Sequence, residues 1–318
     1  MNTKEFESKK GITLVALVVS ILVLLILAGV TLQLAVGEDG IIGGAIVARE
    51  QHEDAEEMEL IELAVSAAMV DGQGELTTEN LNKELREQFT QNTNLFSIPL
   101  GWIYRNFRIY KENGKVEKLP IHCVKYVEST GTQWIDTGVK SNSNLNLTIN
   151  FEALSNNDNS IFGSRTSDVY NQILLNIYRD QTTFVRFNTG IISNRKIFDL
   201  NTQYDASLSK NGLYVNDQKI LSVNQSSFSD DGYTMSVFAF RNSTTGDIIS
   251  YGKIKLYSFF IKENDVIIRN FIPCYTTTTV TDVDGKTCPS GTIGLYDLVE
   301  DQFYTNQGTG EFLKGEDD

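Results

Sequence analysis

Histidine is nearly absent from this 318-residue sequence, which contains only two, His52 and His122. They lie far apart, in segments of different character. A zinc cluster needs several closely spaced ligands, and a Ser-His-Asp triad or a Cys-His pair needs a histidine beside its nucleophile. None of these sites is therefore expected.

Basic residues are also scarce. The sequence has 27 Lys and Arg against 41 Asp and Glu, a formal net charge of −14. Binding to a phosphate backbone depends on clustered Lys and Arg, so nucleic acid is not an expected partner. The acidity is concentrated in residues 38–62, where nine acids and one base, Arg49, give a net charge of −8. Anionic lipid heads repel such a segment, so we expect it to stand away from a membrane surface.

The sequence does have one long apolar run, with no charged residue from Gly11 to Gly37. A helix of about 25 residues at ~1.5 Å per residue is roughly 37 Å long, enough to cross the ~30 Å hydrocarbon core of a bilayer. Lysines precede the run and acidic residues follow it. Because basic flanks stay in the cytoplasm, we expect a single-pass membrane protein with its C-terminal domain outside the cell.

The polar leader that ends in Lys9-Lys10-Gly11, directly before the apolar run, resembles the class III signal of bacterial type IV prepilins and pseudopilins. The resemblance implies that residues 1–11 are a leader, that prepilin peptidase cuts after Gly11, and that Ile12 is then methylated. Residues 12–36 would remain as the transmembrane helix. An ordinary secretory signal keeps its cleavage site beyond the apolar core instead. A plain, uncleaved signal anchor is the alternative.

One position departs from the pilin pattern. The family usually carries Glu at the fifth mature position, where it pairs with the N-terminal amine of a neighbouring subunit, and this sequence has Ala16 there. Membrane anchoring does not depend on that residue. Assembly with other pilin-like subunits into a filament is left open.

Residues 37–119 are predicted to form a pilin-like stalk of helices and a β-hairpin. Glycines at positions 37, 40, 43 and 44 predict a bend after the membrane helix. An apolar stripe predicts a helix from Ile41 to Met69, and a second helix fits Thr78 to Phe89, capped by Thr77 or Thr78.

The stalk is predicted to end in a hairpin. The β-rich run Trp102–Tyr110 and the run Lys115–Leu119 flank Asn113-Gly114, and Asn-Gly between two such runs is a strong hairpin signal. Pro120 follows and marks the expected domain boundary.

Helical periodicity is absent from residues 121–315, where short β-rich runs alternate with Asn, Asp, Ser, Thr and Gly. This pattern predicts an all-β sandwich or barrel of about a dozen strands. The predicted strands are Leu145–Phe151, Ile173–Tyr178, Thr183–Asn188, Leu213–Asn216, Tyr233–Ala239, Lys253–Ile261 and Val266–Ile272.

Several motifs in this region occur in the order found in concanavalin A-like, laminin-G-like jelly rolls, which this region resembles. They are Tyr126–Gly138, Phe162–Arg165, Asn211–Val215, Arg269–Tyr275, Gly294–Leu298 and Phe303–Asn306. The resemblance implies a jelly-roll sandwich over residues 121–315. It does not fix the function, because this architecture serves lectins, glycan-cleaving enzymes and structural spacers.

Catalysis is not expected. Glycan-cleaving enzymes of this architecture place carboxylates on one strand as Glu-x-Asp-x-Glu or Glu-x-Asp-x-x-Glu, about 5–6 Å apart. Residues 121–315 contain no such run, and the sequence has no glycine-rich phosphate loop.

Ligand binding fits the sequence better. Lectins of this architecture hold sugars with an aromatic platform and with Asn, Asp or Arg, sometimes through calcium bound by loop oxygens. The candidate ligand-binding residues are Asn157, Asp158, Asn159, Arg165, Asp168 and Arg241. For Asn157, Asp158, Asn159 and Asp168 the favoured alternative is an ordinary solvated loop. For Arg165 and Arg241 the favoured alternative is structural ion pairing. Trp134 is interpreted as a core residue rather than a sugar platform. Calcium is the one cofactor that the side-chain oxygens of these Asn and Asp residues would suit.

Cysteine is rare as well, with three residues, Cys123, Cys274 and Cys288. Outside the membrane, a disulfide between Cys274 and Cys288 could close a turn-rich loop and add ~3 kcal/mol. The alternative is that all three are reduced.

Together these features predict a prepilin-like cell-surface protein that displays a lectin-like domain for adhesion or glycan recognition, as a minor or tip pilin. Its expected partners are prepilin peptidase, other pilin-like subunits, the membrane and carbohydrate. Two alternatives stay open: a membrane-anchored spacer with no ligand, and a pseudopilin of a secretion or DNA-uptake system.

Overall fold

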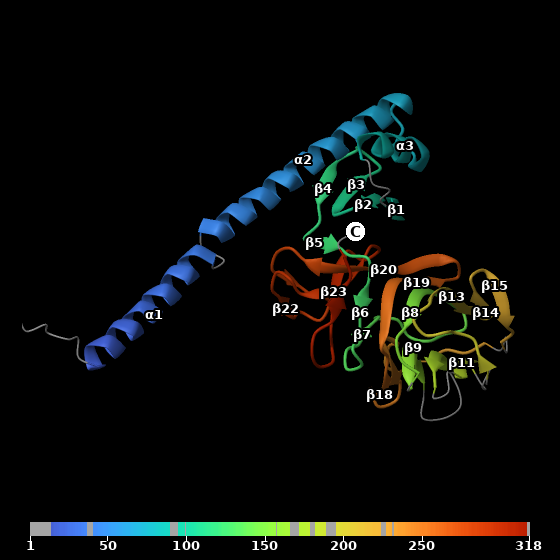
Figure 1. Ribbon diagram of the computed structural model, residues 1–318. Helices are drawn as coiled ribbons and strands as arrows, with labels where there is room; N and C mark the ends of the chain where they lie inside the picture. Colours follow the sequence, from blue (N-terminus) through green and yellow to red (C-terminus); the bar gives the residue numbers. More distant parts are fainter. Residues whose placement is uncertain are drawn as a thin grey trace, which may run out of the picture.

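The computed structural model describes residues 14–36, 41–89, 95–98, 100–156, 158–165, 172–178, 182–188, 195–223, 227–230 and 232–316. Over these residues the chain forms three helices followed by many short strands (Figure 1). Four predicted residues, Gly11, Ile12, Asn157 and Asp168, lie outside the described residues.

Two long helices follow one another along the chain in Figure 1. Helix α1 (Leu14–Val36) carries no charged residue, and its side chains from residue 17 to residue 28 are exposed. Helix α2 (Ile41–Asp71) covers the helix predicted from Ile41 to Met69. The glycine-rich bend is predicted between them, but residues 37–40 are outside the described part. Over the residues that the structure describes, no helix has both the length and the apolar character needed to cross a membrane.

Helix α3 (Thr78–Gln88) begins and ends close to the predicted bounds. Its N-cap is Thr77, whose side chain accepts a hydrogen bond from the Asn80 N–H, while the Asn80 side chain accepts one from the Thr77 N–H. This reciprocal capping satisfies amide groups that the first turn leaves without a partner. Leu81 and Leu85 are buried on one face, as their spacing predicts.

A four-stranded antiparallel sheet packs under α2 and α3. Its strands, in spatial order, are β1 (Leu95–Ile98), β2 (Gly101–Tyr104), β3 (Phe107–Tyr110) and β4 (Val116–Lys118). Its core with the helices includes the fully buried Ile61, Leu81 and Phe107. Helices α2 and α3 and this sheet are called the small unit below.

The small sheet corrects one prediction. The run Trp102–Tyr110, predicted as one strand, is a hairpin that turns at Arg105-Asn106, where Arg105 has φ 53°. The buried Asn106 side chain fixes this turn, because its Oδ1 accepts a hydrogen bond of 2.9 Å from the Cys123 N–H. The hairpin predicted at Asn113-Gly114 is confirmed between β3 and β4.

The remaining strands form a β-sandwich, which confirms the all-β architecture. The larger sheet has eleven strands: β15 (Gln218–Leu221), β14 (Gly212–Val215), β13 (Gln203–Ser209), β8 (Leu145–Ala153), β19 (Ile254–Glu263), β20 (Val266–Thr276), β23 (Ile293–Asp297) and β24 (Gln302–Thr305) in that order, with β5 (Ile121–Cys123), β6 (Val127–Glu128) and β25 (Leu313–Lys314) off this path. The second sheet has eight: β12 (Arg195–Lys196), β11 (Thr182–Asn188), β10 (Gln172–Ile177), β9 (Asn159–Arg165), β16 (Ser236–Val237) and β7 (Ile135–Asp136), with β17 (Ala239–Asn242) and β18 (Ile248–Tyr251). A small hairpin, β21 (Val280–Thr281) and β22 (Thr287–Cys288), stands apart.

The core of the sandwich is apolar and contains side chains from both sheets. Strand β8 alternates strictly between buried and partly exposed residues, as a strand with one face on a core must. At the centre, the ring of Phe259 stacks on Phe162 at 5.6 Å and on Phe271 at 6.1 Å.

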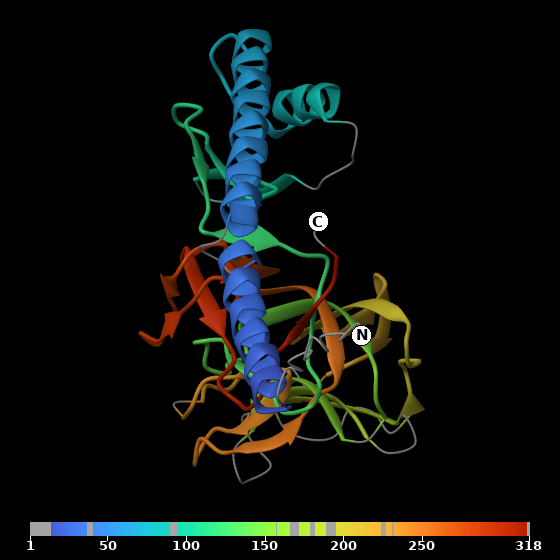
Figure 2. The same cartoon turned by 60° about the vertical axis from the view of Figure 1, so that its left-hand side comes forward.

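A third apolar cluster joins the small unit to the sandwich. It contains Ile103 of β2, Cys123 of β5, Cys274 of β20 and Phe303 of β24. Beside it, the buried Arg108 of β3 donates two hydrogen bonds to the Asp301 carboxylate, one of them 2.7 Å long. The chain passes from the small sheet to the larger sheet of the sandwich at Pro120, and Figure 1 shows the small sheet between α2 and the sandwich. Figure 2 shows α3 beside the end of α2 that lies away from α1.

Candidate functional site

The loop predicted to supply ligand oxygens is held by its own hydrogen bonds. Asn159 is fully buried, and its side-chain nitrogen donates to the carbonyls of Ser155 (2.7 Å) and Lys253 (3.1 Å). Its Oδ1 accepts from the Lys253 N–H. Asp158 precedes it at φ 45°, and its carbonyl accepts a hydrogen bond from Ser250. Asn159 therefore fixes the loop rather than facing a ligand.

Two of the predicted residues, Arg165 and Arg241, lie on neighbouring parallel strands, β9 and β17. Their surroundings differ. The Arg165 guanidinium stacks on the ring of Phe240 at 5.2 Å. The Arg241 guanidinium contacts two other aromatic rings, those of Trp134 and Tyr233.

Arg241 is the centre of the group that we call the Arg241 cluster (Trp134, Tyr233, Arg241). The Arg241 Cζ lies 4.6 Å from the Tyr233 ring centroid and 5.2 Å from that of Trp134. Its Nη1 donates to Asp136 at 2.6 Å, and its Nε donates to the Gly246 carbonyl at 2.9 Å. The structural pairing favoured for this arginine is therefore present. Its Nη2 has no hydrogen-bond partner among the described residues.

The Arg241 cluster is accessible from outside. The Tyr233 side chain is 48% exposed, and Trp134 is half-buried rather than part of the core. Two aromatic rings and a fixed guanidinium thus form a surface platform. Cation–π contacts of this kind stabilise the arrangement by ~0.5–1 kcal/mol at exposed sites.

The loop between β21 and β22 lies next to this platform. The Gln307 side chain donates a hydrogen bond to the Asp284 carboxylate. Burial raises the pKa of Asp284, and the negative charges of Asp282 and Asp136 raise it further, while Arg241 opposes them. The Gln307 N–H also donates to the Trp134 carbonyl at 2.9 Å, so Gln307 links Asp284 to the Arg241 cluster.

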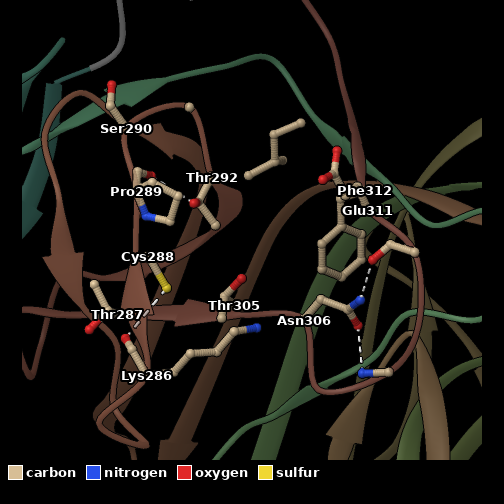
Figure 3. A pocket seen from close by; sticks show the side chains of 14 residues that line it. Lys286, Thr287, Cys288, Pro289, Ser290, Thr292, Thr305, Asn306, Glu311 and Phe312 are labelled. Atoms are coloured by element: carbon tan, nitrogen blue, oxygen red, sulfur yellow. Dashed lines mark hydrogen bonds between the residues drawn. The ribbon is translucent and has the colours of Figure 1, made fainter.

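A pocket of about 400 Å³ opens beside the cluster. Figure 3 shows Lys286 to Thr292 on one side of it and Asn306, Glu311 and Phe312 on the other. Of the predicted ligand-binding residues that the structure describes, Asp158, Asn159, Arg165 and Arg241, none lines it. Its wall combines hydroxyl, amide and backbone groups with the apolar side chains of Pro289, Ile293 and Phe312, and it contains one base, Lys286, and one acid, Glu311.

Trp134 connects the pocket to the cluster. The Asn306 Oδ1 accepts hydrogen bonds from the Trp134 N–H at 3.1 Å and from the Gly308 N–H at 2.7 Å. Position 308 requires glycine, since a Cβ there would lie 2.0 Å from the Thr132 carbonyl oxygen. The same Cβ would lie 3.1 Å from the Trp134 indole, so the pocket wall packs directly against that ring.

This arrangement suits reversible binding of a polar molecule. Pockets of about 300–1,000 Å³ with a few placed polar groups are typical of small-ligand sites. Within the described ranges, no group of three or more His, Cys, Asp or Glu side chains is placed to hold a metal ion.

Sequence reasoning missed Trp134 and Tyr233 as site residues. Trp134 directly precedes β7 and lies between Gln133 and Ile135, which are both buried, while its own indole is only half-buried. The only local hint in the sequence is its place next to the apolar Ile135 at the start of a strand, since neighbouring side chains on a strand point to opposite faces. Tyr233, Asp284 and Gln307 carry no comparable local signal. They meet only because distant loops come together.

All three cysteines are buried free thiols. Cys274 lies opposite Cys123 in the β5–β20 pair, whereas the cross-strand partner of Cys288 is Val280. The predicted Cys274–Cys288 disulfide is therefore not formed in this structure. Burial raises the pKa of the Cys274 thiol well above its usual value.

No protein-family model matches this sequence, and a search of curated proteins found no match.

Proposed function

We propose that this protein is a prepilin-like, membrane-anchored surface protein whose β-sandwich binds carbohydrate. The observation that carries the binding proposal is the Arg241 guanidinium, fixed between the rings of Trp134 and Tyr233 next to a pocket of about 400 Å³ with both polar and apolar walls. Sugar rings have apolar C–H faces that pack on aromatic rings, and hydroxyl groups that hydrogen-bond to planar polar side chains. Both kinds of partner are present here within one surface region.

The finer fold proposal is a concanavalin A-like, laminin-G-like jelly roll. Its support is that the motifs behind the resemblance fall on strands and hairpins of the sandwich. Phe162–Arg165 lies in β9, Asn211–Val215 forms the turn and second strand of the β13–β14 hairpin, and Arg269–Tyr275 lies in β20.

The anchor proposal rests on the uncharged segment that includes α1. A rod of exposed apolar side chains needs a lipid or protein environment. We propose that residues 12–36 hold the protein in a bacterial membrane after prepilin peptidase cuts behind Gly11, with the sandwich on the cell surface. Other pilin-like subunits are the proposed neighbours, and Ala16 is the reason to test filament assembly separately.

The binding test uses the full chain in detergent micelles on a broad glycan array. Trp134→Ala and Arg241→Met should each weaken binding of the recognised glycan at least tenfold. Tyr214→Ala, which removes an aromatic ring from β14 of the other sheet, is the matched control and should bind normally. Absence of binding across the array would overturn the carbohydrate proposal and favour a spacer.

The anchor test is cell fractionation with N-terminal sequencing. We expect a membrane-bound product that begins at a methylated Ile12, and a Gly11→Ala variant that keeps its leader. A mature protein that begins at Met1 would contradict the prepilin proposal.

A further inference from the structure

Two of the three cysteines face each other on the first strand pair beyond the small unit. Cys123 of β5 lies directly opposite Cys274 of β20, and the two strands are antiparallel. Figure 1 shows β5 and β20 side by side where the small sheet meets the sandwich. Both cysteines belong to the apolar cluster that joins the small unit to the sandwich, so their side chains lie on the same face of the strand pair.

The hydrogen bonds of β5 and β20 identify the two cysteines as a non-hydrogen-bonded pair. The Val124 N–H donates to the Pro273 carbonyl at 3.1 Å, one position beyond Cys123 and Cys274. The Cys123 N–H does not bond to β20 and donates to the Asn106 Oδ1 instead. Opposite residues at such a position have Cα atoms about 4.5 Å apart, and their side chains lie closer together than at hydrogen-bonded positions.

This spacing fits a disulfide, which joins Cα atoms about 4.4–6.8 Å apart. Burial raises the pKa of the Cys274 thiol, and the neighbouring Cys123 raises it further, as expected for two sulfur atoms close together. The Cys123 Sγ donates a hydrogen bond of 3.1 Å to the Arg105 carbonyl. Rotation about the Cα–Cβ bond of Cys123 would turn this sulfur from that carbonyl toward Cys274.

The third cysteine is held elsewhere. Cys288 lies opposite Val280 in the β21–β22 hairpin, and its Sγ donates to the Lys286 carbonyl of the same hairpin at 3.6 Å. Cys288 therefore faces no cysteine across its own strand pair.

We propose that Cys123 and Cys274 form a disulfide when the chain folds in the presence of an oxidising disulfide, and that this bond fastens the junction between the small unit and the sandwich. The oxidant is a disulfide of a protein or of a small thiol. The thiolate of Cys123, the more exposed of the pair, attacks one sulfur of the oxidant and releases a first thiol. The Cys274 thiolate then attacks the Cys123 sulfur and releases a second thiol.

The exchange balances. The two cysteine thiols are oxidised, and they lose two protons and two electrons as one new S–S bond forms. The S–S bond of the oxidant breaks, and its two sulfur atoms take up those protons and electrons to leave as two thiols.

Burial decides when this exchange can happen. Cys123 is 6% exposed and Cys274 is 0% exposed, so the closed junction leaves no space for a mixed disulfide beside them. The bond must form before β5 docks or while the junction is open. The dithiol form, which this structure shows, and the disulfide form are then two long-lived states of the folded protein.

The place of the bond determines its effect. β5 directly follows Pro120, where the chain leaves the small unit, and β20 lies within the larger sheet of the sandwich. The bond closes a loop that contains most of the sandwich sequence, and closing a long loop restricts the unfolded chain. It also prevents β5 from leaving β20 while the sandwich remains folded.

The test refolds the full chain from urea in detergent micelles, once with dithiothreitol and once in a buffer of oxidised and reduced glutathione. Peptide mapping of the second sample should find the peptides of Cys123 and Cys274 linked and Cys288 alkylated. The midpoint of thermal unfolding should be at least ~5 °C higher in the glutathione sample than in the dithiothreitol sample.

Variants separate the bond from the packing of the side chains. Cys288→Ala is the matched control, and it should keep both the linked peptides and the rise in midpoint. Cys123→Ala and Cys274→Ala should each lose both. The rise is measured between two samples of the same variant, so a loss of packing in the variant cancels.

The remaining outcomes overturn the inference. A link between Cys274 and Cys288, or glutathione attached to the cysteines with no internal link, would show that Cys123 and Cys274 are not a pair. Three alkylated cysteines in refolded protein from the glutathione buffer would show the same. A Cys123–Cys274 link that leaves the midpoint unchanged would show that the bond does not fasten the junction. None of these outcomes depends on carbohydrate binding.

Discussion

Asp301 is a residue at which protonation should loosen the contact between the small unit and the sandwich. It accepts two hydrogen bonds from Arg108 and one from the Tyr296 hydroxyl. The hydrogen bonds from Arg108 lower the pKa of Asp301, and the Tyr296 hydroxyl lowers it further against the opposing effect of burial. The Arg108 side chain is only 8% exposed, so it depends on this carboxylate.

We expect this contact to weaken in acid. Because the pKa of Asp301 is lower in the folded protein than in the unfolded one, its stabilising contribution is complete above the ordinary value of ~3.9. That contribution is lost as the pH falls through the lower, folded-state pKa. Urea unfolding between pH 2 and 7 should show a steeper loss of unfolding free energy for the native sequence than for Asp301→Asn. Asp265→Asn, at an exposed turn, is the control. Parallel curves for the native protein and Asp301→Asn would contradict the prediction.

The three thiols should be unreactive in the folded protein. Cys123, Cys274 and Cys288 are 6%, 0% and 1% exposed, and burial raises the pKa of the last two. The thiolate is the reactive form, so alkylation of the native protein should be slow at neutral pH. For protein folded with reductant, mass spectrometry after denaturation should count three alkylated cysteines. A count of one would instead show a disulfide, either between Cys274 and Cys288 or between Cys123 and Cys274.

At the scale of single residues, the sequence pointed to one half of the candidate site. Arg241 could be chosen because a charge within a strand run needs a partner. Its partners could not be chosen, because Asp136 and Tyr233 lie on separate segments that only the folded sandwich brings together. Trp134 was assigned to the core because its neighbours have the residue types of a strand, but the structure leaves it half-buried, directly before β7.

At the scale of elements, the start of α3 depends on its capping box. Replacing Thr77 by alanine removes the side-chain oxygen that accepts from the Asn80 N–H. N-cap replacements of this type cost about 1 kcal/mol. Urea unfolding of Thr77→Ala should show a loss of this size, while Glu87→Ala, at an exposed site on the same helix, should stay within ~0.5 kcal/mol of the native protein. Equal stabilities for the two variants would show that the cap contributes nothing.

Elements with strong local patterns were predictable, and those broken by distant contacts were not. Helix α2 and strand β8 follow from apolar spacing alone. The predicted strand Tyr233–Ala239 is instead interrupted at Phe238, which has φ 66° and is fully buried against Phe312 at 4.8 Å. That interruption comes from packing against the C-terminal segment, far away in sequence.

At the scale of the whole molecule, stability should depend most on the aromatic stack between the two sheets. Phe259 is fully buried, with rings on two sides. Replacing a buried phenylalanine by alanine costs about 3–5 kcal/mol through lost burial and the cavity left behind. Denaturant unfolding of Phe259→Ala should show this loss. Phe260→Ala, the next residue on β19 but on the partly exposed face, should lose much less. Similar losses of unfolding free energy in Phe259→Ala and Phe260→Ala would contradict the assignment of Phe259 to the centre of the core.

The overall plan of helices followed by a β-sandwich was predictable, since periodicity changes abruptly near Pro120. How the two parts pack together was not. The cluster that joins them draws Ile103, Cys274 and Phe303 from segments far apart in the sequence, and no local pattern marks these residues as neighbours.

The junction also has a mechanical consequence. The polypeptide crosses from the small unit to the sandwich once, and the first strand beyond the crossing, β5, is hydrogen-bonded to β20. Tension applied to the rim of the sandwich would reach the helices through this strand pair. The neighbouring apolar cluster and the Arg108–Asp301 pair would share the load. A force that separates the two parts would therefore load the β5–β20 pair together with these contacts.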